Sequence, residues 1–180
     1  MSVSENVQHE AFKTRVLIYS SSTHHAQLIQ KVLKFHNKDV DWFGQNSRNT
    51  ENDFVVLQTS EASEAAGFNP TIVLVSSNVL SECLDTVFNS ITPGGVLVYP
   101  ETIGNIVENT AVYFRKLPYA SSDIKQNADV SYFVTELGDI PVFGLDSHVI
   151  DDLQGIKLFC VQFGIMEEEF FEALAELLLN

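Results

Sequence analysis

The stretch "RVLIYSSSTHHAQLIQKVLKFH", residues 15–36, joins an apolar strand, a turn of small residues and an amphipathic helix. The strand is bounded by the serines, and the apolar residues after the turn recur at helical spacing. These are Leu28, Ile29, Val32, Leu33 and Phe35. A strand, a small-residue turn and a helix in this order are typical of a phosphate-binding loop. This turn nevertheless contains neither the glycine nor the lysine that such a loop uses.

Further apolar runs at 39–43, 53–58 and 71–77 are short, rich in β-branched or aromatic residues, and separated by polar stretches. Continuous apolar strands indicate burial on both faces, as in a parallel sheet covered by helices. A helical pattern over 79–91 precedes a Pro-Gly-Gly break and another strand, "VLVYP". The alternation of strands and helices predicts a three-layer α/β fold around a mostly parallel, doubly wound sheet.

The second half of the chain has a different pattern. Segments 111–119, 130–137 and 139–145 alternate apolar and polar residues, which predicts a small antiparallel sheet or hairpin added to the main sheet. Two closing helices are expected, the first capped by Asp146 or Ser147 and the second formed by "IMEEEFFEALAELLL". The buried stripe of that last helix is expected to be Phe170, Phe171, Leu174, Leu177 and Leu178.

The expected organisation is a disordered lead-in at 1–13 and one α/β domain at 14–180. The stretches "NSRNTEND" and "SEASEAAGFNP" are predicted to be long surface loops.

Composition narrows the function classes. A net charge of -14 disfavours binding to nucleic acid and to anionic membranes. The N-terminus has no signal-peptide pattern and the chain has no apolar run long enough to span a membrane, so a soluble cytoplasmic protein is expected. Cys83 and Cys160 lie in apolar helical patterns without metal-ligand spacing, which predicts buried free thiols.

Three segments resemble the central ATP-binding domain of the Mur ligases of peptidoglycan synthesis, in particular the UDP-N-acetylmuramate:L-alanine ligase and muropeptide-recycling types. They are "LIQKVLKFHNKDVDWFGQ", "ITPGGVLVYPE" and "PVFGLDSHVIDDLQGIKLFCVQFGIMEEEFFEAL". The resemblance covers roughly residues 15–180, and this chain is similar to only one of the three domains of those enzymes.

The resemblance implies a degenerate phosphate loop. The family's loop has the pattern G-T-x-G-K-T-T, and alignment through the helix places its lysine on Ser22, the preceding glycine on Ser21 and its metal-binding threonine on Thr23. Only the threonine matches. The vestigial loop comprises Ser20, Ser21, Ser22, Thr23 and His24. His24 and His25 are expected to be a surface pair at the start of the helix, with a phosphate or metal role as the alternative.

Other family positions are altered as well. The family's metal-binding glutamate corresponds to Gln58, whereas Glu61 is retained, so this region is interpreted as a vestigial metal site. His148 resembles a histidine at an adenine-contacting helix start, and Asp152 takes the place of an asparagine in the same motif. We therefore treat His148 and Asp152 as candidate nucleotide contacts, with a structural role for His148 as the alternative.

The resemblance thus implies a stand-alone, non-catalytic homologue of the Mur ligase central domain, a pseudoenzyme acting through binding or interaction in peptidoglycan synthesis or recycling. No catalytic residue and no bound metal are expected, no cofactor is required, and ATP/Mg²⁺ binding should be weak or absent. A homodimer or a cell-wall enzyme is the expected partner, with the last helix as a candidate surface. The alternative is a nucleotide- or anion-binding module, or part of an ATP-dependent acid–amino acid ligase, that uses the Ser20–Thr23 turn.

Overall fold

The computed structural model describes residues 13–44, 52–127 and 130–179. Its centre is a six-stranded sheet with the order β2-β3-β1-β4-β5-β6, in which every neighbouring pair is parallel. The strands are β1 (Thr14–Tyr19), β2 (Asp41–Trp42), β3 (Phe54–Thr59), β4 (Ile72–Val75), β5 (Val96–Pro100) and β6 (Arg115–Tyr119). Strand β1, which precedes the small-residue turn of the stretch 15–36, lies inside this sheet between β3 and β4.

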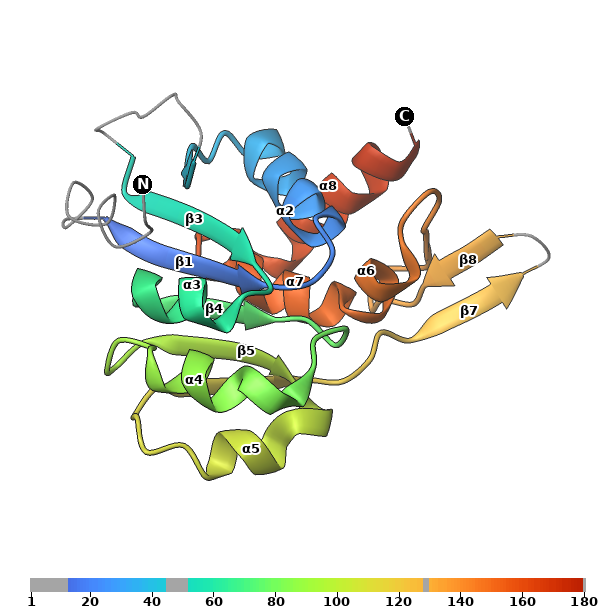
Figure 1. Cartoon of the computed structure of the whole chain (residues 1–180). Coiled ribbons are helices and arrows are strands. Elements are labelled where there is room, and N and C mark those ends of the chain that lie inside the picture. Colours follow the sequence, from blue (N-terminus) through green and yellow to red (C-terminus); the bar gives the residue numbers. More distant parts are fainter. Residues whose placement is uncertain (1–12, 45–51, 128–129, 180) are drawn as a thin grey trace.

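Helices cover both faces of the sheet (Figure 1). One face carries α2 (His24–Phe35), α6 (Ser147–Asp151), α7 (Leu153–Val161) and α8 (Glu167–Leu179). The other carries α3 (Ala62–Phe68), the 3-10 helix η2 (Ser81–Cys83), α4 (Leu84–Asn89), the 3-10 helix η3 (Glu101–Ile103) and α5 (Gly104–Glu108). The predicted three-layer, mostly parallel α/β fold is therefore confirmed.

The side chains of β1 alternate between the two cores. Val16 and Ile18 pack with α2, α7 and α8, whereas Leu17 and Tyr19 pack with α3 and α4. Successive strand residues point to opposite faces, so a strand covered on both sides must be apolar throughout. This explains why "VLIY" is an unbroken apolar run.

The small antiparallel sheet is present, but its composition differs from the expectation. It consists of β7 (Ile124–Asn127), β8 (Val130–Phe133) and β9 (Ile140–Pro141), and β7 and β8 extend beyond the carboxyl ends of the parallel strands (Figure 1). The segment 111–119 was wrongly predicted to belong to it: β6 pairs with β5 in the parallel sheet. Lys116 and Pro118 on one face of β6 are not buried, and a strand with one partly exposed face has the alternating pattern that suggested a hairpin.

Several local predictions need correction. The predicted loop at 60–70 contains helix α3 and is not a long loop. The helix predicted over 79–91 begins later, leaving Leu80 and Cys83 exposed. The final region forms three helices instead of two, and Asp146 caps the first of them.

Residues 1–12 of the expected lead-in and 46–51 of the first expected loop lie outside the described residues. In the described part of the chain, no helix has both the length and the apolar character needed to cross a membrane.

Candidate functional site

The carboxyl ends of β1, β3 and β4 meet at one edge of the sheet, where ligands of open α/β sheets usually bind. The loop after β1 begins at Ser20, and the loop after β4 contains Ser76, Ser77 and Asn78. Gln58 lies at the same level of β3, opposite Ile18 of β1. The predicted vestigial loop therefore lies where a binding site is expected.

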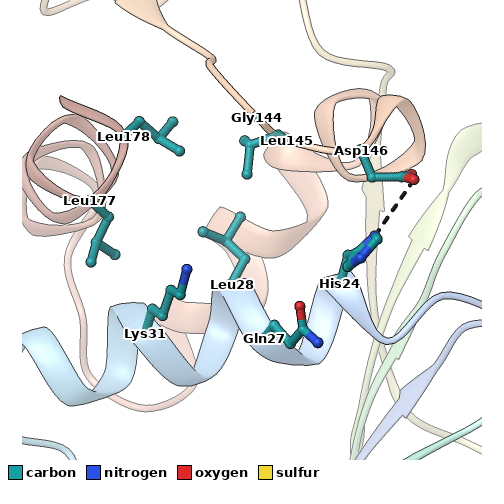
Figure 2. Close-up of a pocket in the computed structure, with 9 residues that line it drawn as sticks. All are labelled: His24, Gln27, Leu28, Lys31, Gly144, Leu145, Asp146, Leu177 and Leu178. Carbon is teal, nitrogen blue, oxygen red and sulfur yellow. Dashed lines mark ion pairs between the residues drawn. The ribbon is translucent and has the colours of Figure 1, made fainter. Parts of the chain in front are cut away.

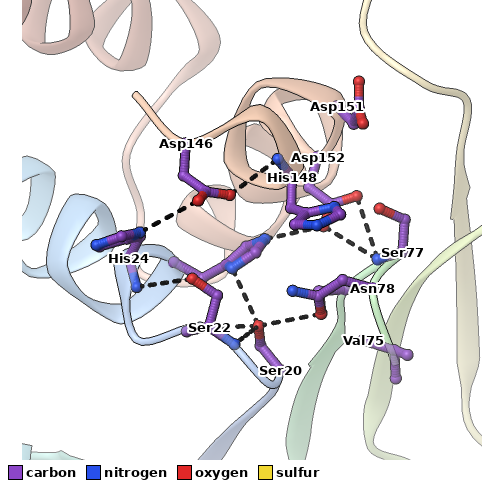
Figure 3. Close-up of polar contacts among 12 residues, drawn as sticks. Ser20, Ser22, His24, Val75, Ser77, Asn78, Asp146, His148, Asp151 and Asp152 are labelled. Carbon is purple, nitrogen blue, oxygen red and sulfur yellow. Dashed lines mark hydrogen bonds and ion pairs between the residues drawn. The ribbon is translucent and has the colours of Figure 1, made fainter. Parts of the chain in front are cut away.

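Serine hydroxyl groups of the loop after β1 accept from two backbone N–H groups of the same segment (Figure 3). The Ser22 N–H donates to the Ser20 hydroxyl at 3.1 Å, and the His24 N–H donates to the Ser22 hydroxyl at 3.3 Å. The Gln58 side-chain amide donates to the Ser20 carbonyl oxygen at 2.8 Å, which ties the loop to β3. Two backbone donors that a phosphate loop would present to its ligand are thus used inside the loop.

His25 is buried, contrary to the expectation of a surface pair. Its Nδ1 lies 3.0 Å from the Ser20 hydroxyl, and its Nε2 lies 2.9 Å from Asp152 Oδ2. The side chains of His25 and Asp152 are 0% and 1% exposed. His24 is exposed, because consecutive helical residues point about 100° apart. The sequence contained a signal for this burial: His25 shares the helical face of Leu28, Ile29 and Val32.

Asp152 collects hydrogen bonds from three separate elements. Besides His25, it accepts from the Ser77 N–H at 3.0 Å and from the Tyr119 hydroxyl at 2.9 Å. The Tyr119 hydroxyl also lies 2.9 Å from the Val75 carbonyl oxygen. Burial, and next the charge of Asp152, raise the pKa of Tyr119, which therefore remains a donor. Asp152 faces the interior, where these groups surround it, and its contact with a nucleotide stays a prediction.

The Tyr119 ring lies against the backbone of α7. A Cβ atom added to Gly155 would lie 2.5 to 2.7 Å from three atoms of this ring. Glycine at this position allows the helix to approach the ring closely enough for the neighbouring Asp152 to reach the tyrosine hydroxyl. Sequence reasoning did not find Tyr119 or Gly155 because their roles depend on contacts between distant segments.

Ser20, His25 and Asp152 form a chain of contacts in the order found in catalytic triads. The Ser20 side chain, however, is 0% exposed, and its oxygen also accepts from the Ser22 N–H. A nucleophile must reach its substrate, so this chain of contacts is structural. We call the buried residues Ser20, His25, Asp152 and Tyr119, together with the backbone N–H of the exposed Ser77, the buried polar network.

Asp146 and His148 lie at the start of α6, beside the network. Asp146 accepts from the His148 backbone N–H at 3.0 Å, and His24 Nδ1 lies 3.6 Å from its carboxylate. The hydrogen bond from His148 lowers the pKa of Asp146 below its ordinary 3.8. His148 itself is exposed, so a ligand has access to it.

A pocket of about 110 Å³ lies between α2, the end of α8 and the loop before α6 (Figure 2). Its walls include Lys31, Leu177 and Leu178. The predicted stripe of α8 is mostly used within the chain, because Phe170, Phe171 and Leu174 are buried, whereas Leu177 and Leu178 remain half-buried in this pocket.

A larger pocket of about 280 Å³ opens on the other side of the loop after β1. It is lined by Tyr19, Ser21, Ser60, Glu61, Asn78, Val79, Leu80, Glu82 and Cys83. Two of these residues are acidic and none is lysine or arginine. We call it the acidic pocket. Cys83 is exposed at this pocket, which corrects the prediction of a buried thiol, whereas Cys160 is buried as expected.

The region predicted to be a vestigial metal site contains no ligand cluster. Gln58 is hydrogen-bonded to the loop, while Glu61 lines the acidic pocket. Among residues 13–44, 52–127 and 130–179, no group of three or more His, Cys, Asp or Glu side chains is arranged to hold a metal ion.

The chain matches no model of a known protein family, and a search of curated proteins finds no similar sequence. Solved structures with the same fold do exist. MurF from Acinetobacter baumannii has a TM-score of 0.69 and 12% identity over 97% of this chain and 48% of its own.

The UDP-N-acetylmuramate:L-alanyl-γ-D-glutamyl-meso-diaminopimelate ligase from Neisseria meningitides has a TM-score of 0.64 and 13% identity over 96% of this chain and 68% of its own. MurF from Thermotoga maritima, solved in complex with ADP, has a TM-score of 0.62 and 11% identity over 90% of this chain and 49% of its own.

This chain spans about half the length of the first of these structures. At such low identities the similarity establishes the fold alone. The chain therefore has the fold of a Mur ligase domain, as the sequence resemblance implied.

Proposed function

We propose that this chain is a non-catalytic homologue of the Mur ligase central domain that acts by binding or interaction in peptidoglycan synthesis or recycling. The observation that carries the proposal is the state of the loop after β1. The backbone N–H groups of Ser22 and His24 are bonded to the loop's own serines, and Ser22 occupies the position expected for the phosphate-binding lysine.

Electrostatics supports the same conclusion. A nucleoside triphosphate brings several negative charges, and catalysis of phosphoryl transfer depends on compensating them with lysine, arginine or Mg²⁺. The acidic pocket beside the loop offers Glu61 and Glu82 instead. The -14 net charge of the chain adds a general repulsion.

The buried polar network supports the proposal independently, because it fixes the conformation of the loop. His25 and Asp152 fix the first turn of α2 to the junction of α6 and α7, so the loop is held from beneath as well as from β3. Adapting it to a triphosphate would require breaking buried hydrogen bonds, each of which is costly to leave unmade.

Isothermal titration with ATP/Mg²⁺, ADP and UDP-sugars tests the proposal. We expect no saturable heat with either adenine nucleotide and no thermal shift. Saturable binding of ATP/Mg²⁺ would overturn the proposal and favour the nucleotide-binding alternative.

A gain-of-function variant provides the matched comparison. Ser21→Gly with Ser22→Lys restores the Gly-Lys-Thr part of the family pattern, because Thr23 follows, but leaves the Ser20 hydroxyl, which accepts from the backbone N–H of residue 22. Adding Ser20→Gly frees that N–H group. Measurable ATP binding by the triple variant but not by the double variant would support a loop closed by its own hydrogen bonds.

The proposed interaction would use the exposed edge of the pocket formed by Leu177, Leu178 and Lys31 (Figure 2). A second copy of the chain or a cell-wall enzyme is the proposed partner. Light scattering at high protein concentration tests the first option, and replacing both leucines by serine should shift a dimer towards monomer.

A further inference from the structure

The acidic pocket contains a buried polar group without a partner. Tyr19 closes β1 and lines this pocket, and only 3% of the residue is exposed. Within the described residues its hydroxyl makes no hydrogen bond. Buried tyrosine hydroxyl groups usually have a partner, so this one is available to a ligand.

Tyr19 shares the walls of the acidic pocket with Cys83 and Glu61. Burial, followed by the charges of Cys83 and Glu61, raises the pKa of Tyr19, and both of these neighbours line the pocket. The phenol is therefore neutral at physiological pH, and its oxygen is free to accept a hydrogen bond from a donor in the pocket.

Two carboxylates accompany the phenol. Glu61 lies at the start of α3 and Glu82 lies in η2, so the two carboxylates come to the pocket from separate segments of the chain. Neither side chain has an ion pair or hydrogen bond within the described residues. A carboxylate only accepts hydrogen bonds, so the ligand group between them must be a donor, and a positive charge suits it best.

The remaining walls restrict the ligand further. Val79 and Leu80 form an apolar side, and 79% of Leu80 is exposed, an unusual position for a leucine that no other element covers. A volume of about 280 Å³ admits a small molecule. A bare metal ion fits poorly, because the described residues provide no cluster of three ligating side chains.

We propose that the acidic pocket binds a small organic ammonium ion, with its charged nitrogen between Glu61 and Glu82, an N–H group donated to Tyr19, and its carbon chain against Val79 and Leu80. The site deepens the proposed binding role and needs the pocket to be free of nucleotide.

Cys83 provides a direct measurement of occupancy, because it is exposed in this pocket whereas Cys160 is buried. Alkylation by the neutral reagent iodoacetamide is followed by intact mass spectrometry at constant ionic strength. The probes are n-butylammonium, n-butanol and butyrate, which share a carbon chain and differ in charge. We expect saturable slowing of Cys83 alkylation by butylammonium alone.

The variants Glu61→Gln and Glu82→Gln should each raise the half-protecting concentration about three- to fivefold, the effect of losing one ion pair near the surface. Tyr19→Phe should also raise it, whereas Glu168→Gln, an exposed carboxylate on α8, should not. Circular dichroism confirms that each variant is folded.

Three results would overturn the inference: no protection by butylammonium, equal protection by n-butanol, or stronger protection by magnesium chloride. The nucleotide titrations fail or succeed independently of this panel. ATP binding at the loop together with amine protection of Cys83 would refute the proposed function and leave this inference standing.

Discussion

Replacing Asp152 with alanine should strongly destabilise the protein. The carboxylate accepts hydrogen bonds from His25, Tyr119 and Ser77, and both members of the His25–Asp152 pair are buried. Removing one partner of a buried pair costs about 3 to 5 kcal/mol, and Ser77 would lose the acceptor of its backbone N–H. Tyr119 keeps the Val75 carbonyl oxygen as an acceptor, which limits its loss.

We therefore expect Asp152→Ala to lower the free energy of unfolding by about 4 kcal/mol, a large fraction of the 5 to 15 kcal/mol typical of a domain. For a chain of this size the melting temperature should fall by about 8 to 16 °C. Urea unfolding followed by circular dichroism and by the fluorescence of Trp42, the single tryptophan, measures both quantities.

The neighbouring Asp151 provides the matched control. It is exposed, and its side chain makes no hydrogen bond or ion pair with the residues that the structure describes, so Asp151→Ala should change stability by less than about 0.5 kcal/mol. His25→Ala combined with Asp152→Ala should cost less than the sum of the two single changes, because the pair is lost only once. If Asp152→Ala were as stable as Asp151→Ala, Asp152 would be free to bind a ligand and the buried polar network would be refuted.

Three other changes have definite expected outcomes. Gly155→Ala should cost about 1 to 3 kcal/mol in urea unfolding because its Cβ meets the Tyr119 ring, whereas Gly104→Ala, with open space around it, should cost nothing; equal effects would contradict the close approach. The pKa of Asp146 is lowered in the folded state, so its stabilising contribution is complete above the ordinary 3.8 and disappears as the pH falls through the lower folded value. The stability difference between the unmodified protein and Asp146→Ala should shrink over that acidic range, and a constant difference would refute the cap. In the native protein one thiol, Cys83, should react with iodoacetamide, while Cys160 should react only after unfolding, because burial both shields it and raises its pKa; modification of two thiols without urea would contradict its burial.

The fold was predictable because it depends on patterns that are local in sequence. The apolar runs of β1 and β4 are continuous because helices cover both faces of these strands, and the loop–helix boundary at Ser20–Thr23 follows from small polar residues before an amphipathic helix. Strand β6 was misassigned because an alternating pattern is shared by edge strands and hairpins. Only pairing with β5, which is set by tertiary packing, separates the two.

The candidate site was less predictable because its contacts join residues far apart in the chain. His25 and Asp152 are 127 positions apart, and neither residue reveals its partner. The position of His25 on the apolar face of α2 indicated burial, and a buried histidine requires a hydrogen-bond partner. The sequence alone does not show which of its acidic residues is the partner of His25. Only the fold, which places the junction of α6 and α7 beside the loop, identifies Asp152.

The buried polar network also affects which ligands the loop after β1 can bind. A phosphate loop needs backbone N–H groups that are free to bind the phosphate, and a lysine whose flexible side chain brings its positive charge to it. In this chain the Ser20 hydroxyl connects the loop to the buried polar network. Its oxygen accepts from the Ser22 N–H and contacts His25, which in turn contacts Asp152. Under the proposed function, the buried carboxylate of Asp152 behind His25 also disfavours a phosphate group at the loop. Under the proposed function, the serines that bond the loop's own N–H groups disfavour phosphate, and the acidic pocket beside the loop places further carboxylates where a ligand would bind.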